Sequence, residues 1–199
     1  MSITPPTHDP PAWDWSPRFS VAKYQRMIEV GVFTADDKVE LVDGYILIKD
    51  SEGPLHDVAI DRVKAVLASL PGDRWVRTQR TVVLAESQME PDFAVVRANP
   101  QAYSTHYPAG QETGLIIEVA DSSLLRDQRD KTRIYARAGI SVYWIINLVD
   151  RRVEMYTQPS GPTAVPAYGA FQTYQPGDTV PLVLDGTSVG SVPAADLLP

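Results

Sequence analysis

The sequence predicts an α/β fold in which helices flank a central mixed β-sheet, with extra strands at its periphery. Two runs, 114–120 and 142–148, are rich in Ile, Val, Trp and Tyr at both alternating positions, as expected of strands covered on both faces. Between them, residues 124–138 show helical spacing and are followed by Gly139, a typical helix stop. Strand, helix and strand in this order predict a crossover connection within a mixed sheet.

Two further helices are expected in the N-terminal half. The first covers 20–30, with Ser20 as its N-cap and Gly31 as its stop. The second covers 56–70, where apolar residues recur at helical spacing until Pro71-Gly72 ends the segment.

The remaining elements are expected to be strands. Residues 39–48 predict a hairpin that turns at Asp43-Gly44, because an Asp-Gly turn fits the twist of two paired strands. Further runs of strand-forming residues lie at 75–84, 89–96, 152–156, 171–174 and 180–184. The last three of these runs are expected at the periphery of the sheet.

One domain is expected over 19–199, with a core at about 36–157 and C-terminal strands at 170–185. A hydrophobic fraction of 44% in 199 residues is ample for such a core. Residues 1–18 are rich in proline and are expected to form a loosely attached arm.

The composition excludes several classes of protein. The chain has no cysteine, so disulfides, thiolate zinc sites and a cysteine nucleophile are excluded. No apolar run approaches the roughly 20 residues that a membrane helix needs. The first residues lack the basic start and apolar stretch of a secretory signal. The absence of cysteine fits a reducing cytoplasm, which is the expected location.

The formal net charge of −7 counts against a conventional nucleic-acid-binding protein, which usually carries a basic surface. A local basic groove stays open as an alternative, because seven arginines are clustered in the sequence: Arg74, Arg77, Arg80, Arg126, Arg129, Arg133 and Arg137. Arginines that only solvate the surface explain the same pattern.

Two carboxylates interrupt or border hydrophobic strands, where packing alone gives no reason for a charge. Asp92 precedes an apolar run, and Glu118 lies within the run 115–120. A buried charge is costly unless it is paired or binds a metal. Because Mg²⁺ takes one or two carboxylates and keeps several waters, Asp92 and Glu118 predict a Mg²⁺ site, with Mn²⁺ as the alternative ion.

Lys131 is the third candidate residue of this site. At about 100° per residue, Lys131 and Tyr135 share the stripe of the 124–138 helix that faces the sheet, and Lys131 is expected beside Glu118. Its ammonium could position an attacking water or stabilise charge on a phosphate. Asp127, one turn earlier, could anchor Lys131 or join the site. A purely structural ion pair is the alternative.

Three more polar residues are accessory candidates. Glu40 could add a carboxylate, or could be a solubilising charge on an edge strand. Gln79 could hydrogen-bond a water or a phosphate, although an ordinary strand glutamine is the default. His56, at the start of the second helix, could line the same cleft, or could serve only in capping or packing.

Several sequence blocks resemble one family, and together they span about 19–156. They are 40–44 (ELVDG), 52–56 (EGPLH), Gln79, 90–96 (EPDFAVV), 118–123 (EVADSS), Asp127, Lys131, 135–140 (YARAGI) and 143–146 (YWII). The chain resembles the Uma-type family of restriction endonucleases, a branch of the PD-(D/E)xK nuclease superfamily. The resemblance implies a restriction-endonuclease-like core, with Asp92 and Glu118 as metal ligands and Glu40 as an accessory carboxylate.

The chain departs from the superfamily pattern at one position. That pattern has a lysine two residues after the second acid, where this chain has Ala120. Within the branch that the chain resembles, the lysine has moved to the following helix, and Lys131 satisfies that arrangement.

The first functional hypothesis is therefore a Mg²⁺-dependent endonuclease that hydrolyses DNA with a metal-activated water, and homodimers are expected from the resemblance. The alternative is a catalytically inactive nuclease-fold module with a binding or regulatory role, which the acidic pI of about 4.9 and Ala120 favour. A third hypothesis is a toxin-like or mobile-element accessory protein whose partner supplies the DNA contact.

Overall fold

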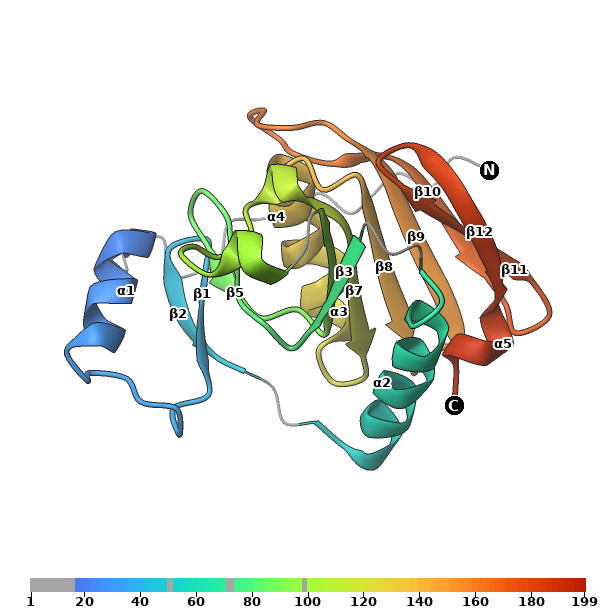
Figure 1. The fold of residues 1–199 in the computed structure, drawn as a ribbon, viewed down its shortest axis with the longest axis horizontal. Helices are drawn as coiled ribbons and strands as arrows, with labels where there is room; N and C mark the ends of the chain where they lie inside the picture. The colour runs from blue at the N-terminus through green and yellow to red at the C-terminus, as the bar shows by residue number, and fades with distance from the viewer. Residues whose placement is uncertain (1–16, 50–51, 71–73, 98–99) are drawn as a thin grey trace.

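A six-stranded sheet in the order β10-β9-β8-β7-β6-β3 forms the centre of the molecule (Figure 1). The computed structural model describes residues 17–49, 52–70, 74–97 and 100–199, so the expected arm at 1–18 lies almost wholly outside the described residues. β7 and β8 are parallel, and every other neighbouring pair is antiparallel. The six strands are β3 (Arg74–Thr78), β6 (Phe93–Arg97), β7 (Thr113–Ala120), β8 (Val142–Asn147), β9 (Arg152–Pro159) and β10 (Tyr168–Tyr174).

Two smaller sheets accompany the central one. The first has the order β2-β1-β5-β4 and consists of β1 (Val39–Val42), β2 (Tyr45–Ile48), β4 (Val82–Val83) and β5 (Gln88–Met89). Its hairpin turns at Asp43 and Gly44, whose φ angles of 52° and 83° are the left-handed values that the expected turn requires. The second is a hairpin of β11 (Thr179–Leu184) and β12 (Thr187–Pro193).

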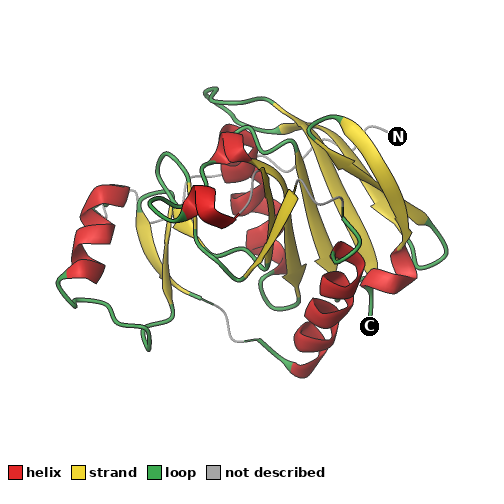
Figure 2. Ribbon diagram, in the orientation of Figure 1, coloured by secondary structure: helices red, strands yellow, loops and turns green. Residues whose placement is uncertain are grey.

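Helices are drawn in red in Figure 2: several lie against the central sheet, whereas the first helix lies beside the small four-stranded sheet. They are α1 (Val21–Glu29), α2 (Pro54–Leu67), α3 (Leu124–Arg126), the π-helical segment η3 (Asp127–Lys131), α4 (Thr132–Arg137) and α5 (Ala194–Leu197), with short 3₁₀ segments η1 (Pro100–Tyr103) and η2 (Gly110–Glu112). Ser20 caps α1 as expected, because its side chain accepts a hydrogen bond from the N–H of Lys23 at 3.2 Å. Among the described residues, none of the helices combines the length and the apolar character needed to cross a membrane.

Each face of the central sheet has its own hydrophobic cluster. One cluster joins the sheet to α2, α5 and the β11–β12 hairpin, and includes Val63, Leu67, Phe93, Leu182 and Leu197. The other joins it to α4 and the small sheet, and includes Val42, Met89, Ile116, Ile134 and Tyr135. The predicted α/β fold with a central mixed sheet is confirmed, as is the crossover between β7 and β8.

Two predicted strands are each divided in the structure. The run at 75–84 was expected as one strand, but Gln79 adopts a φ of 47°, and β3 and β4 belong to different sheets. The run at 89–96 divides into β5 and β6, with Pro91 between them. Proline has no N–H to donate to a ladder, so it suits a break between two strands.

Two other expectations need correction. The helix at 124–138 is present, but its middle turn, Asp127–Lys131, is π-helical rather than α-helical. The strand at 152–156 was expected at the periphery, whereas β9 pairs with β8 inside the central sheet and Val153 and Glu154 are fully buried.

Candidate active site

Asp92 and Glu118 stand side by side at one end of the central sheet. Phe93 of β6 pairs with Ile117 of β7, so the next facing positions along the two strands are Asp92 and Glu118. The Oδ2 atom of Asp92 accepts the N–H of Val119 at 2.8 Å, which fixes this carboxylate against β7. Both residues are buried, so each carboxylate needs a hydrogen-bond donor or a cation as its partner.

Lys131 reaches Glu118 from the helical segment that follows β7. Its Nζ lies 3.0 Å from Oε1 of Glu118 and 3.0 Å from Oδ1 of Asp127. The hydroxyl of Tyr135 donates to the same Oε1 of Glu118 at 2.7 Å. The second oxygen of Glu118, Oε2, has no partner within the part of the chain that the structure describes.

Burial and the charges of neighbouring groups have opposite effects on the pKa values of Glu118 and Lys131. Burial raises the pKa of Glu118 to about 8, while the positive charge of Lys131 opposes that rise. For Lys131, burial lowers the pKa, but the nearby carboxylates of Glu118, Asp127 and Glu40 outweigh burial and raise it. The ammonium is therefore held in its charged form, and the site retains a cation beside the two acids.

The π-helical turn is anchored from three sides. The carbonyl oxygen of Asp127 accepts hydrogen bonds from Thr132 Oγ1 at 2.8 Å and from Tyr143 Oη at 3.3 Å. The side chain of Ser123 donates to the Asp127 carboxylate. Gln128 Nε2 donates to both carboxylate oxygens of Glu154, at 2.9 and 3.0 Å. Since π-helical turns occur frequently at functional sites, this turn is consistent with a positioning role for Lys131.

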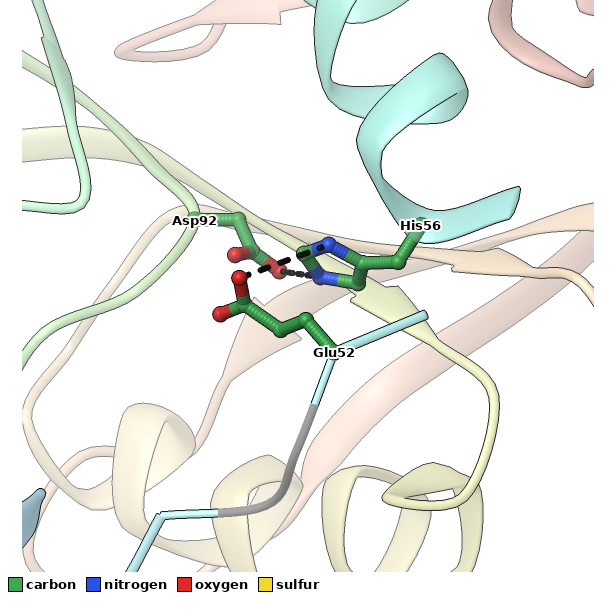
Figure 3. A group of neighbouring side chains, drawn as sticks. All are labelled: Glu52, His56 and Asp92. Atoms are coloured by element: carbon green, nitrogen blue, oxygen red, sulfur yellow. Dashed lines mark hydrogen bonds and ion pairs between the residues drawn. The ribbon is translucent and has the colours of Figure 1, made fainter. Parts of the chain in front are cut away.

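His56 joins the site from the first turn of α2. Its Nε2 lies 3.3 Å from Oδ2 of Asp92, and its Nδ1 lies 3.9 Å from Oε2 of Glu52. Figure 3 shows the carboxylates of Asp92 and Glu52 close to each other, both turned toward the imidazole. Burial lowers the pKa of His56, but the hydrogen bond and the charge of Asp92, with the charge of Glu52, outweigh burial and raise it.

These residues line one open cleft with a volume of about 60 Å³. Its lining comprises Glu40, Lys49, Glu52, Gly53, His56, Glu90, Asp92, Glu118, Val119, Asp121, Ser122, Ser123, Arg126 and Lys131. Carboxylates outnumber the basic side chains in this lining, and Glu40 is 5% exposed. A water needs about 10–15 Å³ of such space, so the cleft has room for an ion with a few waters.

Two candidate residues lie outside the lining of the cleft. Gln79 was a candidate to hydrogen-bond a water or a phosphate, with an ordinary strand glutamine as the default; its side chain donates to Glu52 at 3.3 Å and its N–H donates to the carbonyl of Asp92 at 3.0 Å. Asp127 is 1% exposed and lies behind Lys131, which it holds by the ion pair described above. Both therefore support residues of the cleft rather than facing it.

The sequence reasoning did not identify Glu52 or Glu154 as site-related residues. Glu52 precedes α2 and lies four positions before His56, a spacing that could have singled it out. Glu154 follows Val153 in a strand expected to be peripheral, so its burial left no signal in the sequence.

The clustered arginines pair mostly with acids. Arg133 and Arg137 both donate to Asp43, Arg74 pairs with Asp185 at 2.8 Å, and Arg129 pairs with Asp130 at 2.9 Å. Arg77 instead stacks on the ring of Trp75, at 4.8 Å from its centroid. Only Arg126 of the seven lines the cleft in the described part of the chain.

Comparisons with known proteins agree with the family that the sequence resembles and with the fold described above. The family model Uma2, described as "Putative restriction endonuclease", matches residues 21–189. A solved structure described as a putative nuclease belonging to DUF820, from Anabaena variabilis ATCC 29413, is similar in fold, with a TM-score of 0.68 and 13% sequence identity. The match covers 90% of this chain and 97% of that one. No curated protein matches the chain.

Proposed function

We propose that this chain, which belongs to the Uma2 family, is a Mg²⁺-dependent endonuclease that hydrolyses DNA phosphodiester bonds. The observation that carries the proposal is the convergence of Asp92, Glu118 and Lys131 on one cleft. The sequence alone had singled out the same three residues for the same chemistry.

The donor set fits a hard divalent cation. Asp92 and Glu118 supply oxygen atoms from adjacent positions, and Oε2 of Glu118 has no other partner among the described residues. The excess of carboxylates in the lining also favours a cation. When bound, such an ion polarises a phosphate oxygen and lowers the pKa of an attacking water.

The chain's own residues then orient the reactants. The ammonium of Lys131 faces the cleft, where it can hold the attacking water and stabilise the negative charge that develops on the phosphate. Asp127 and the π-helical turn fix the position of that ammonium. The oxygen of the attacking water forms a bond to phosphorus as that water gives up a proton to solvent, the bond from phosphorus to the leaving oxygen breaks, and the leaving oxygen takes up a proton from a solvent water.

The accessory residues have supporting roles in this proposal. Glu40 adds negative charge beside Lys131 and can accept a hydrogen bond from a water of the ion. Gln79 acts indirectly, because its side chain donates a hydrogen bond to Glu52 and its N–H donates one to the carbonyl of Asp92. We further propose a single domain over 19–199, a cytoplasmic location and a homodimer.

A catalytically inactive nuclease-fold module is the second candidate function. It is favoured by Ala120, which replaces the usual lysine, and by the 3.0 Å contact through which Lys131 already occupies Oε1 of Glu118. In such a module the pair would only stabilise the fold.

Plasmid nicking distinguishes the two functions. Supercoiled DNA is incubated with Mg²⁺ or Mn²⁺ and with wild type, Asp92→Ala, Glu118→Ala or Lys131→Ala. The proposal expects nicking by wild type and its loss in all three variants. His106→Ala is the control, since His106 is exposed, pairs with Glu112 at 3.4 Å and does not line the cleft. Equal residual activity in wild type and the three variants would favour the inactive module.

A further inference from the structure

Arg77 is a buried cation that no carboxylate of the described residues neutralises. It is 8% exposed and lies on β3, at the edge of the central sheet (Figure 1). Its Nε is buried without a hydrogen-bond partner, and its Nη2 donates only to the carbonyl of Thr81, at a long 3.4 Å. Because a buried charge is costly unless it is paired, this guanidinium has unused capacity to bind an anion.

Two aromatic rings hold the guanidinium in place. Its Cζ lies 4.8 Å from the ring centroid of Trp75 and 5.9 Å from that of Tyr103, and the two rings stack on each other at 6.1 Å. Trp75 is two positions before Arg77, so both side chains leave β3 on the same face. Contacts with ring faces fix the plane of a guanidinium and leave the N–H groups at its edge available to donate.

The segment after β3 brings a second arginine close to the first. Gln79 has a left-handed φ of 47°, and Arg80 follows it as an exposed residue without an ion pair to any described residue. Burial lowers the pKa of Arg77, and the positive charge of Arg80 lowers it further. Two guanidinium groups therefore lie near each other in a chain whose net charge is −7, and an anion between them would relieve their repulsion.

Two carboxylates of neighbouring segments are already engaged by other groups. Glu90 pairs with Lys49 at 3.0 Å, and Glu112 pairs with His106 at 3.4 Å. Neither of these acids forms an ion pair with Arg77. The anion that this buried cation lacks is therefore not supplied by the described part of the chain.

The two arginines border the cleft that holds Asp92. Gln79, which lies between them in the sequence, donates its N–H to the carbonyl of Asp92 at 3.0 Å. The hydroxyl of Thr81 donates to Glu90 at 3.4 Å, and Glu90 lines the cleft. A DNA strand in the cleft carries further phosphates on both sides of the one that is cleaved, and one of them can reach this border.

We propose that Arg77 and Arg80 form a subsite for a backbone phosphate of DNA, outside the cleft and beside the phosphate that is cleaved. The inference rests on the proposed function and adds a contact to the same substrate. Guanidinium groups match the oxygens of a phosphate and bind them with paired hydrogen bonds. Such a contact positions the strand and reads no base.

Binding of a fluorescently labelled DNA duplex to the full-length chain tests the subsite without any reaction. Anisotropy is measured in EDTA at several salt concentrations. Arg77→Met and Arg80→Gln are each expected to weaken binding about tenfold and to make the dependence of log K on log salt shallower by about 0.9. Equal affinities and equal salt dependence in wild type and both variants would overturn the proposal.

Arg62→Gln is the matched control for the loss of one positive charge. Arg62 is exposed on α2, which packs on the opposite face of the central sheet from Trp75, and it donates to the carbonyl of Ala195 at 3.2 Å. This variant should bind the duplex as wild type does. If it weakens binding as much as Arg80→Gln, only the net charge matters and the subsite is wrong.

Thermal melts separate the subsite from a structural role of Arg77. Methionine keeps an unbranched side chain against Trp75 and removes an unpaired buried charge, so Arg77→Met should melt no lower than wild type. Inorganic phosphate should raise the melting temperature of wild type and of Arg62→Gln more than that of Arg77→Met. A lower melting temperature with unchanged DNA affinity would mean that Arg77 has a partner within the chain. Stabilisation by phosphate with unchanged DNA affinity would mean a site for free phosphate, and either result overturns the proposal.

The subsite and the nuclease proposal can fail separately. If DNA binding depends on Arg77 and Arg80 but wild type and the cleft variants nick equally little, the nuclease proposal is overturned and the subsite stands. If wild type nicks plasmid and Arg77→Met nicks with the same KM and kcat, the subsite is overturned and the nuclease proposal stands.

Discussion

Glu118 and Glu154 are buried carboxylates on the same sheet, yet their surroundings differ. Glu118 pairs in register with Ile145 of β8, and Ile145 pairs with Glu154 of β9, so the two acids belong to one row across the strands. Gln128, Asn147, Arg152 and Tyr156 donate to the oxygens of Glu154. Within the described residues, the partners of Glu118 all contact Oε1, and this side chain lines an open cleft.

The difference shows what separates a structural carboxylate from a candidate ligand. Burial alone does not, because Glu154 is 0% exposed and Glu118 is 4% exposed. What differs is the remaining capacity to accept: the oxygens of Glu154 are satisfied by protein donors, whereas Glu118 keeps one oxygen for a ligand. The same criterion distinguishes Nδ1 of His56.

The largest expected effect tests Glu118 as a ligand. Glu118→Gln should lower the plasmid-nicking rate by about 10³-fold or more, equal to about 4 kcal/mol. Its thermal stability should fall less than that of Glu154→Ala, because Gln keeps the shape of the side chain and Lys131, although it loses one carboxylate partner, still pairs with Asp127 at 3.0 Å. Nicking assays and thermal melts of the same preparations measure both quantities. If the variant nicks at the wild-type rate, Glu118 is not a ligand that the reaction needs, and it does not differ from Glu154 in this respect.

Glu154→Ala should show the opposite pattern of effects. It leaves the donors of Asn147, Arg152 and Tyr156 without their shared acceptor, and should lower the free energy of unfolding by about 3 kcal/mol. Binding of Mn²⁺ at temperatures well below its melting transition should persist, since Glu154 does not line the cleft. Urea unfolding and calorimetry test this pair of expectations, and unchanged stability would refute the structural role.

Asp43 sharpens the comparison as a charged carboxylate with two cationic partners. Burial opposes its ionisation, but Arg133 and Arg137 outweigh burial and lower the pKa of Asp43 from 3.8 to about 2. A depressed pKa in the folded state contributes stability above the unfolded pKa, and this contribution is lost as pH falls from about 4 to about 2. It amounts to about 2 kcal/mol. In Asp43→Asn, the free energy of unfolding in urea should not show this loss between about pH 4 and about pH 2. If the variant and wild type have the same dependence of unfolding free energy on pH, the assigned role of Asp43 is wrong.

The smallest effect concerns the hydroxyl of Tyr135. Tyr135→Phe removes the 2.7 Å hydrogen bond to Oε1 of Glu118 and should change the free energy of unfolding by about 1 kcal/mol. Lys131 remains on that oxygen, so the nicking rate should fall only a few-fold. Denaturant unfolding and nicking rates provide the measurements, and a loss as large as that of Glu118→Gln would mean that Tyr135 has a direct role in the reaction.

The sequence contains the strand and helix patterns because burial selects apolar residues at regular spacing. It therefore predicted the sheet, the crossover and the order of Asp92, Glu118 and Lys131 along the chain. It did not predict the division of β3 from β4, since the left-handed φ of Gln79 is not tied to its residue type. Glu52 was missed although His56 lies only four positions away, because Asp92, which completes the group shown in Figure 3, is distant in the sequence, and Glu154 was missed because its strand was mistaken for an edge.

The π-helical turn at Asp127–Lys131 has a consequence for how sequences of this kind are aligned. A π turn holds one more residue than an α turn, so the residues on its two sides follow different angular phases. Deleting one residue there would restore a regular helix with a similar apolar pattern, but it would rotate the lysine by about 100° away from the acid. Counting positions from Glu118 is therefore an unreliable way to locate the lysine in a related chain, and the three-dimensional register has to be compared instead.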